Sequence, residues 1–388
     1  MKILVILSRV PYPLEKGDKL RAFNQIKQLS KNNEIILFAL SDRDYDEKAE
    51  IELRKYCSTI SIIRFSKITI LFNLIRTLFD GKPFQVGYFY FKRAQKKVDE
   101  LIKKYQPDHI YCQLIRTVEY VKSYSNIPKT LDYMDVFSKG MERRKYSAPF
   151  YLKPLLNIEY KRLLKYENRI FNYFNNKTII SDQDKNLIPH PQKNDIVVVP
   201  NGVDTDFFNP VPCKKEYELL FNGNMNYPPN IESVQYLVNK IMPLVWKQLP
   251  NTRLFISGAT PHPKVLELKS DKVIISGWVD DIRENFMKCK ILIAPMQISI
   301  GLQNKLLEAM AMKLPCVTSV LANNALGAIN GQQIMVAQTP EEYAACIFDL
   351  LNDENKAKQL ADNAYQFVNA NFNWESKTHI LENLFYKK

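Results

Sequence analysis

Short apolar runs typical of buried strands alternate with helical patterns along nearly the whole chain. The first strand is predicted at Lys2–Leu7 and the next at Glu34–Leu40, and residues 18–31 between them repeat apolar side chains at the helical period. The same alternation returns in the second half, with strands predicted at Tyr217–Asn222 and Ile291–Ala294. Such a pattern favours parallel sheets covered by helices on both faces, that is, a doubly wound α/β fold.

The length of the chain requires more than one such sheet. A chain of 388 residues exceeds what a single hydrophobic core usually supports. Proline and glycine cluster in residues 189–202 and mark a change of unit, so we place a domain boundary between residues 192 and 193. The sequence therefore predicts two doubly wound domains that face each other across a cleft formed by the carboxyl ends of their strands.

The segment 301–311 combines a glycine loop with a strong helix start. Gly301, Gln303 and Asn304 lead into the helix, whose first N–H groups and positive dipole end favour a phosphate. Lys305 and Glu308 are three residues apart and share one helix face. The ammonium suits a diphosphate, and the carboxylate suits the two hydroxyls of a ribose. The simpler alternative is an ordinary strand–helix unit with a surface ion pair.

This segment resembles the nucleotide-sugar signature of the family-4 glycosyltransferases, which have the GT-B fold of two Rossmann-like domains. The similarity is closest to the bacterial sugar transferases associated with exopolysaccharide and exosortase (PEP-CTERM) loci, in which the helix opens Gly-x-Gln-Asn-Lys as it does here. Further matching segments follow the same order in the chain, at residues 12–19, 132–135, 200–204, 222–225 and 276–279. The resemblance therefore spans nearly the whole sequence.

The resemblance implies a hexosyltransferase-type enzyme that moves a sugar from a UDP- or GDP-linked donor to a polysaccharide or lipid-linked glycan acceptor, in cell-surface glycan biosynthesis. It also implies retention at the anomeric carbon and no required cofactor or metal. Residues 1–192 would bind the acceptor, residues 193–374 would bind the donor, and a last helix, 375–388, would return to the first domain. The donor-binding candidates are Gly17, Gly223, Asn224, Val279, Gly301, Gln303, Asn304, Lys305 and Glu308.

Two positions expected near the transferred sugar depart from the family pattern. Ile300 stands where many members have a glutamate, and Met134 stands where many have a catalytic histidine. The carboxylates available beside Met134 are Asp132 and Asp135. We therefore take both as catalytic candidates, Asp135 being the one placed to orient or deprotonate an acceptor hydroxyl, with a loop-capping aspartate as the alternative.

A third departure concerns the charge of the departing diphosphate. Many members place an arginine and a lysine soon after the glycine matched by Gly223, whereas no cation follows it here. We assign that catalytic role to Lys305, assisted by Arg9 or Arg116 of the first domain. These departures keep two alternatives open, namely a GT-B sugar-nucleotide 2-epimerase and a non-catalytic donor-binding subunit.

The formal net charge of +13 is concentrated in the first half of the chain. Residues 1–190 contain 35 Lys/Arg and 21 Asp/Glu, a surplus of +14, whereas residues 191–388 contain 19 and 20. No nucleic-acid-binding motif accompanies this charge, so we expect an anionic membrane as the partner rather than nucleic acid. Residues 62–91, rich in Phe, Tyr, Ile and Leu between basic residues, suit a membrane surface, although core-facing helices with basic outer faces are the alternative.

The cysteines, histidines and apolar runs indicate the compartment. The six cysteines are far apart and the four histidines form no pair with metal-ligand spacing, so we expect free thiols and no metal site. No run approaches the roughly 20 apolar residues of a membrane span. We therefore expect a cytoplasmic protein, peripheral on the inner face of the cytoplasmic membrane.

Overall fold

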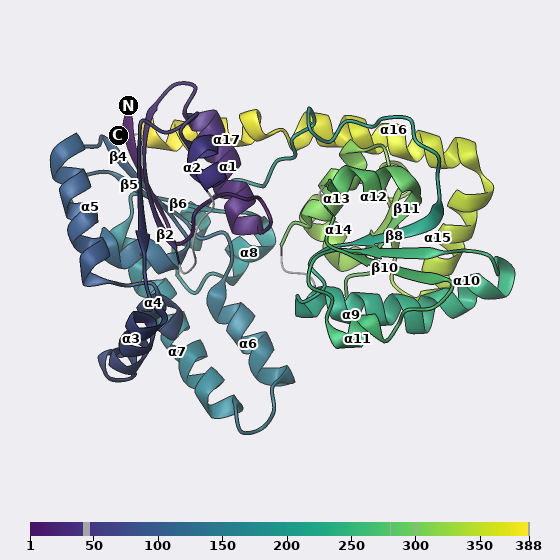
Figure 1. Ribbon diagram of the computed structural model, residues 1–388, viewed down its shortest axis with the longest axis horizontal. Helices are drawn as coiled ribbons and strands as arrows, with labels where there is room; N and C mark the ends of the chain where they lie inside the picture. The colour runs from purple at the N-terminus through teal and green to yellow at the C-terminus, as the bar shows by residue number, and fades with distance from the viewer. Residues whose placement is uncertain (42–46, 280, 299–300, 387–388) are drawn as a thin grey trace. The chain divides into compact units, whose positions relative to one another are not determined.

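Figure 1 shows a computed structural model of the chain, which describes residues 1–41, 47–279, 281–298 and 301–386. The chain divides into two compact units. The first combines Met1–Pro200 with Trp374–Lys388, and the second is Asn201–Asn373. Each unit is built on one parallel sheet with interleaved helices, which confirms the predicted doubly wound α/β class.

The first unit contains a seven-stranded sheet in the order β3-β2-β1-β4-β5-β6-β7. Its strands are β1 (Lys2–Leu7), β2 (Glu34–Ser41), β3 (Thr59–Arg64), β4 (His109–Gln113), β5 (Lys129–Asp132), β6 (Asn176–Ile179) and β7 (Val197–Val198). Leu4 and Ile6 of β1 belong to one hydrophobic core cluster. Ile3, Val5 and Leu7 belong to a second cluster. Because successive side chains of a strand point to opposite faces, β1 is buried on both sides.

Helices cover both faces of this sheet (Figure 1). They are α1 (Gly17–Leu29), α2 (Glu47–Leu53), α3 (Lys67–Asp80), α4 (Phe84–Tyr88), α5 (Lys92–Tyr105), α6 (Phe137–Ser147), α7 (Lys153–Ile170), α8 (Asp182–Leu187), α17 (Trp374–Tyr386) and the short 3-10 helices η1 (Ile115–Tyr120), η2 (Phe171–Tyr173) and η3 (Lys193–Asp195). The last helix, α17, packs on this unit, since Phe385 stacks on His109 with ring centroids 4.3 Å apart and Asn176 Nδ2 donates to the Leu384 carbonyl at 2.8 Å.

A fully buried ion pair ties α1 to this sheet. The Arg21 and Asp132 side chains are both 0% exposed, and Arg21 Nε and Nη2 donate to the two oxygens of Asp132 at 2.6 and 3.2 Å. The hydroxyls of Tyr111 in β4 and Thr178 in β6 lie 2.9 and 3.1 Å from the same carboxylate at the end of β5. One carboxylate thus connects a helix with three neighbouring strands, and four donors surround its oxygens.

The second unit contains a six-stranded sheet in the order β10-β9-β8-β11-β12-β13. Its strands are β8 (Tyr217–Asn222), β9 (Leu254–Ser257), β10 (Val273–Gly277), β11 (Cys289–Ala294), β12 (Cys316–Ser319) and β13 (Met335–Ala337). Its helices are α9 (Pro228–Tyr236), a π-helical turn η4 (Leu237–Ile241), α10 (Met242–Gln248), α11 (Pro263–Leu266), α12 (Ile282–Lys288), α13 (Asn304–Ala311), α14 (Val320–Leu326), α15 (Pro340–Asn352) and α16 (Glu354–Asn371).

The boundary between the units differs from the one expected at residues 192 and 193. Residues 193–200 belong to the first unit, because β7 pairs in parallel with β6 through Thr178 and Val197. Trp374, at the start of α17, also belongs to the first unit. The proline and glycine signals thus mark the region of the change, whereas strand pairing sets its position.

We expect the loss of one member of the Arg21–Asp132 pair to destabilise the first unit strongly. Arg21→Met leaves a carboxylate buried without its counter-charge, which typically costs about 3–5 kcal/mol, and urea unfolding followed by circular dichroism measures this loss. The double variant Arg21→Met/Asp132→Leu should recover much of it. Arg54→Met removes an exposed guanidinium that pairs with Glu50 and should leave the unfolding midpoint nearly unchanged. If Arg21→Met and Arg54→Met lowered the free energy of unfolding equally, the special role of the buried Arg21–Asp132 pair would be contradicted.

Candidate functional site

Each sheet has one point at which the strand order reverses. In the first unit this point lies between β1 and β4, and in the second between β8 and β11. The loops that leave the carboxyl ends of such a strand pair diverge to opposite faces of the sheet, and the crevice between them is where open α/β sheets bind ligands. Nearly all predicted site residues follow one of these strands or a neighbour of one.

Three glycines lie at the carboxyl ends of neighbouring strands in the second sheet. Gly223 follows β8, Gly258 follows β9 and Gly277 ends β10, with φ angles of 156°, 152° and 73°. A Cβ atom on Gly258 would lie 1.6 Å from the Gly223 carbonyl oxygen. A Cβ atom on Gly223 would lie 2.7 Å from Asn230 Nδ2 and 3.1 Å from Lys305 Nζ. Side chains at Gly223 and Gly258 would therefore collide with neighbouring protein atoms, and glycine lets the loops of this glycine edge pack closely.

The Lys305 ammonium is buried beside this glycine edge, with the residue only 8% exposed. Its Nζ donates to Asn230 Oδ1 at 2.7 Å, lies 3.9 Å from the Met296 sulfur and sits 4.3 Å from the centre of the Phe221 ring. These direct contacts are all neutral groups. Burial lowers the pKa of Lys305 to about 7, an effect that the negative charge of Glu308 opposes.

Glu308 lies one turn further along α13 and is half-buried. Burial raises the pKa of its carboxyl group to about 7, an effect that the positive charge of Lys305 opposes. The two groups thus stabilise each other's ionised form from consecutive turns, while burial acts against both. Paired shifts of this kind are typical of functional sites.

The start of α13 offers backbone donors next to Lys305. Gln303 precedes the helix and makes no side-chain capping hydrogen bond, and Asn304 Oδ1 accepts instead from Asn201 Nδ2 at 3.0 Å. Gly301 has a φ of 66°, which turns the chain into the helix. Within the part of the chain that the structure describes, no side chain caps the first N–H groups of α13, which therefore suit an anion. Ile300 lies outside the described residues.

The two remaining donor-side candidates of the second unit lie at the same edge. Asn224 follows Gly223, is exposed and accepts a hydrogen bond from the Asn226 N–H at 2.9 Å. Val279 follows β10 and is half-buried. The structure thus brings Gly223, Asn224 and Lys305 together around the loop after β8. Val279 belongs to the loop after β10, which is separated from β8 by β9.

Sequence reasoning missed two residues of this arrangement. Asn230 of α9 is 5% exposed and joins the loop after β8 to α13, because its Nδ2 donates to the Asn224 carbonyl at 2.9 Å and its Oδ1 accepts from Lys305. It lies in the stretch after Gly223 that contains no cation, and a single neutral amide there carries no sequence pattern. Gly258 follows its strand just as Gly223 does, and this repeated strand–glycine pattern was the available signal.

In the first unit, two arginines flank the reversal point. Arg9 follows β1, and Arg116 lies in η1 after β4. Arg9 Nη1 donates to Asp18 Oδ2 at 2.6 Å, and Arg116 Nη2 donates to Gln85 Oε1 at 3.0 Å. Both arginines line a cavity of about 300 Å³, whose other lining residues are Leu74, Phe84, Gln85, Tyr88 and Phe89. Gly17, at the start of α1, is exposed and lies next to Asp18.

The two candidate catalytic carboxylates differ in their surroundings. Asp132 is fully buried in the pair with Arg21, an arrangement that favours a structural role over the catalytic role expected from the sequence. Asp135 follows β5, is half-buried and accepts a hydrogen bond from the Val136 N–H at 2.7 Å. Burial raises the pKa of Asp135, while that hydrogen bond and the charges of Arg143 and Arg116 oppose the change. Of the two, Asp135 alone keeps the accessibility that a general base needs.

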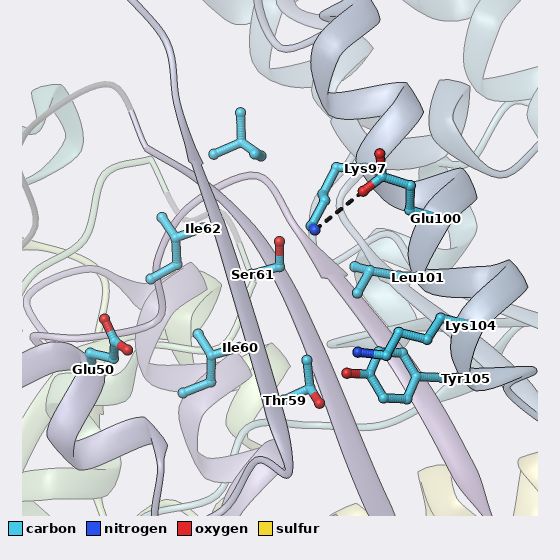
Figure 2. A pocket seen from close by; sticks show the side chains of 11 residues that line it. Glu50, Thr59, Ile60, Ser61, Ile62, Lys97, Glu100, Leu101, Lys104 and Tyr105 are labelled. Carbon is cyan, nitrogen blue, oxygen red and sulfur yellow. Dashed lines mark hydrogen bonds and ion pairs between the residues drawn. The ribbon is translucent and has the colours of Figure 1, made fainter.

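Two further features lie outside the predicted sites, namely the distribution of metal-ligating side chains and a second cavity. Within the part of the chain that the structure describes, no group of three or more His, Cys, Asp or Glu side chains is placed to hold a metal ion. Figure 2 shows a pocket of about 450 Å³ along β3, between α2 and α5. Its Lys97 and Glu100 pair with each other at 3.3 Å. This pocket lies at the outer strand of the sheet and contains none of the predicted site residues.

Comparisons with known proteins identify a related family domain and similar folds. Residues 216–353 match the family model described as "Glycosyl transferases group 1". An "uncharacterized 44.6 kDa protein in cps region" of Klebsiella pneumoniae is 25% identical over 394 residues, which is 96% of each chain. Sucrose-phosphate synthase of Thermosynechococcus elongatus superposes with a TM-score of 0.71 at 14% identity, covering 99% of this chain and 98% of that one. Anabaena HepE, solved in complex with UDP, superposes with a TM-score of 0.66 at 14% identity, covering 99% of both chains.

These findings concern the second unit and the fold of the chain. The second unit carries a glycosyl transferases group 1 domain, and the whole chain has the GT-B fold. The resemblance drawn from the 301–311 segment is thereby confirmed, and the relative from a capsule region fits the association with exopolysaccharide. Family domain and fold together support glycosyl transfer as the activity.

Proposed function

We propose that the protein transfers a hexose from a UDP- or GDP-linked donor to a polysaccharide or lipid-linked glycan acceptor in cell-surface glycan biosynthesis. The observation that carries this proposal is the buried Lys305 ammonium, which faces neutral groups beside the glycine edge. A nucleoside diphosphate carries the negative charge that such a cation favours. The UDP bound to Anabaena HepE and the capsule-region relative support the donor class and the pathway.

In this proposal different residues of the second unit bind different parts of the donor. The α13 N–H groups and Lys305 hold the diphosphate, and Gly223 lets it approach the backbone. Glu308, when ionised, accepts two hydrogen bonds from the ribose hydroxyls. Negative charge grows on the diphosphate as the bond to the sugar breaks, so Lys305 stabilises the transition state more than the bound donor. We place the base of the nucleotide near Val279, in the loop after β10.

The acceptor side of the reaction belongs to the first unit in this proposal. Asp135 orients the acceptor hydroxyl or removes its proton, and its raised pKa makes it a better base than an ordinary aspartate. We further propose that the configuration at the anomeric carbon is retained and that no metal is required, as the resemblance implies. The charge of the leaving diphosphate is then met by Lys305 and by the helix dipole.

A test of this function incubates the protein with UDP- and GDP-hexoses and measures release of UDP or GDP, first without an acceptor. We expect slow release by the wild type. Lys305→Ala should lower turnover by about 10²–10³-fold and should change the donor KM much less, because the interaction strengthens in the transition state. Lys313→Ala is the matched control, since Lys313 is an exposed lysine of the same unit that pairs with Asp362.

Two results would contradict the proposal. If the wild type binds UDP but releases none from any UDP- or GDP-hexose, the chain is a donor-binding subunit. If chromatography shows a second nucleotide sugar in place of free UDP or GDP, the reaction is an epimerisation.

The first unit also carries an exposed apolar face that supports membrane contact. The face is formed by large side chains of α3 that are 46–85% exposed and recur at helical spacing, namely Ile68, Leu71, Phe72, Ile75, Leu78 and Phe79. Arg162 of α7 donates to the Thr77 and Leu78 carbonyls at 2.7 and 3.0 Å, which fixes the end of α3 beside α7 (Figure 1). Contiguous exposed apolar side chains of this kind mark interaction surfaces.

We propose that this α3 face lies on an anionic membrane surface, as the surplus of +14 in residues 1–190 favours. Among the described residues, no helix is long and apolar enough to cross a membrane. Arg76 lies 4.0 Å from Asp80, and Lys82 lies 2.9 Å from Glu119. Because these carboxylates neutralise two of the nearby cations, apolar contact contributes more of the binding than the sequence indicated.

Vesicle sedimentation tests this surface. At low salt the wild type should pellet with phosphatidylglycerol vesicles and stay in solution with phosphatidylcholine vesicles, and high salt should release part of it. Phe72→Ser/Phe79→Ser should lower the bound fraction at least about tenfold, because each buried aromatic side chain contributes about 1.5–3 kcal/mol. The matched control is Ile51→Ser, which removes an exposed apolar residue from α2. Equal binding by the double variant and the wild type would exclude α3 as the contact.

A further inference from the structure

The cavity at the reversal point of the first sheet has the chemistry of a site for an amphipathic phosphate. We propose that it binds the phosphate end of a lipid-linked acceptor, with Arg9 and Arg116 on the phosphate and the apolar walls on the first part of the lipid chain. This inference rests on the proposed function, since it names the class of acceptor. It assigns the two arginines to the acceptor and not to the departing diphosphate of the donor.

The cations of this cavity leave room for an anion. Arg116 Nη2 contacts a neutral amide oxygen of Gln85, and its guanidinium lies 5.0 and 4.9 Å from the ring centres of Phe89 and Phe137. Its Nε is buried, and none of the described residues accepts a hydrogen bond from it. Burial and the neighbouring charge of Arg9 lower the pKa of Arg116 to about 10. Arg9, one-third exposed, has its Nη1 on Asp18. A phosphate between the two guanidinium groups relieves their repulsion and accepts from several N–H donors.

The walls of the cavity are apolar. Leu74, Phe84, Tyr88 and Phe89 line it together with the two arginines and Gln85. Leu74 belongs to α3 and stands one turn from Leu71 and Leu78, at the margin of the exposed apolar face. The cavity therefore continues the surface that we place on the membrane. A lipid phosphate can enter it while the rest of its chain remains at that surface.

The dimensions and the wall chemistry select among phosphate ligands. A volume of about 300 Å³ is at the lower end of the roughly 300–1,000 Å³ of small-molecule sites, so it holds a head group and a short piece of chain. Free phosphate or diphosphate gains nothing from four apolar walls and loses hydration there. A neutral lipid leaves the guanidinium groups uncompensated. Only a ligand with both features matches both sets of side chains.

Calorimetry with three soluble probes tests the proposal. Farnesyl diphosphate carries both a phosphate group and an apolar chain, inorganic diphosphate lacks the chain, and farnesol lacks the phosphate. We expect farnesyl diphosphate to bind the wild type at least about tenfold more tightly than either of the other two probes. This ratio corresponds to a difference of about 1.4 kcal/mol in binding free energy. Arg116→Met and Arg9→Met should each weaken it by a similar factor, and Leu74→Ser should weaken farnesyl diphosphate but not inorganic diphosphate. Thermal unfolding confirms that each variant is folded.

The matched control is Arg54→Met, which removes an exposed arginine of the same unit and should bind as the wild type does. Three outcomes overturn the proposal: no binding of farnesyl diphosphate, equal binding of inorganic diphosphate, or unchanged binding in both arginine variants. A loss of UDP affinity in Arg116→Met equal to its loss of farnesyl diphosphate affinity also overturns it, because the arginine would then serve the donor. Failure of the proposed function is separate, since it shows as absent UDP and GDP release while farnesyl diphosphate still binds.

Discussion

The burial of the Lys305 ammonium is the constraint on which the donor side depends. A cation removed from water is costly unless compensating groups surround it. Here the nearest groups are an amide oxygen, a thioether and an aromatic face, and Glu308 attracts it only from the next turn of α13. Gly223 lies beside this ammonium, since a Cβ atom there would be 3.1 Å from Lys305 Nζ. In our proposal the diphosphate of the donor supplies the negative charge that these neutral contacts lack.

Each unit has a cation close to the point at which the strand order of its sheet reverses. Arg116 of the first unit follows β4, and Lys305 of the second unit follows β11. Each of these strands is one of the two between which the strand order reverses. Both cations contact neutral amides and aromatic rings, and burial lowers the pKa of both. The parallel sheets explain this similarity, because their carboxyl ends gather loops and helix starts in one place. In our proposals one cation receives the donor diphosphate and the other an acceptor phosphate.

The sequence predicted the architecture because buried parallel strands and amphipathic helices leave clear periodic patterns. It placed Lys305 and Glu308 on one helix face, which spacing alone determines. It did not distinguish Asp132 from Asp135, because the partner that buries Asp132, Arg21, is distant in the chain and meets it only through the packing of α1 on β5. It also missed Asn230, since a single amide has no pattern, and it set the unit boundary before β7, a strand of two residues too short for a periodic signal.

The pH dependence of UDP binding tests the central claim about Lys305 most directly. Burial lowers the pKa of Lys305 to about 7, and a bound diphosphate raises it again, so binding above that pH takes up a proton. Between about pH 8 and about pH 8.8 the phosphates and Glu308 are already ionised and the uracil ring of UDP is still mostly neutral, so Lys305 is the main group that titrates. Calorimetry should show the wild-type affinity falling by up to about tenfold per pH unit. The Lys305→Arg variant should show no such fall, because its guanidinium stays charged. A wild-type affinity that does not change over this range would contradict the account.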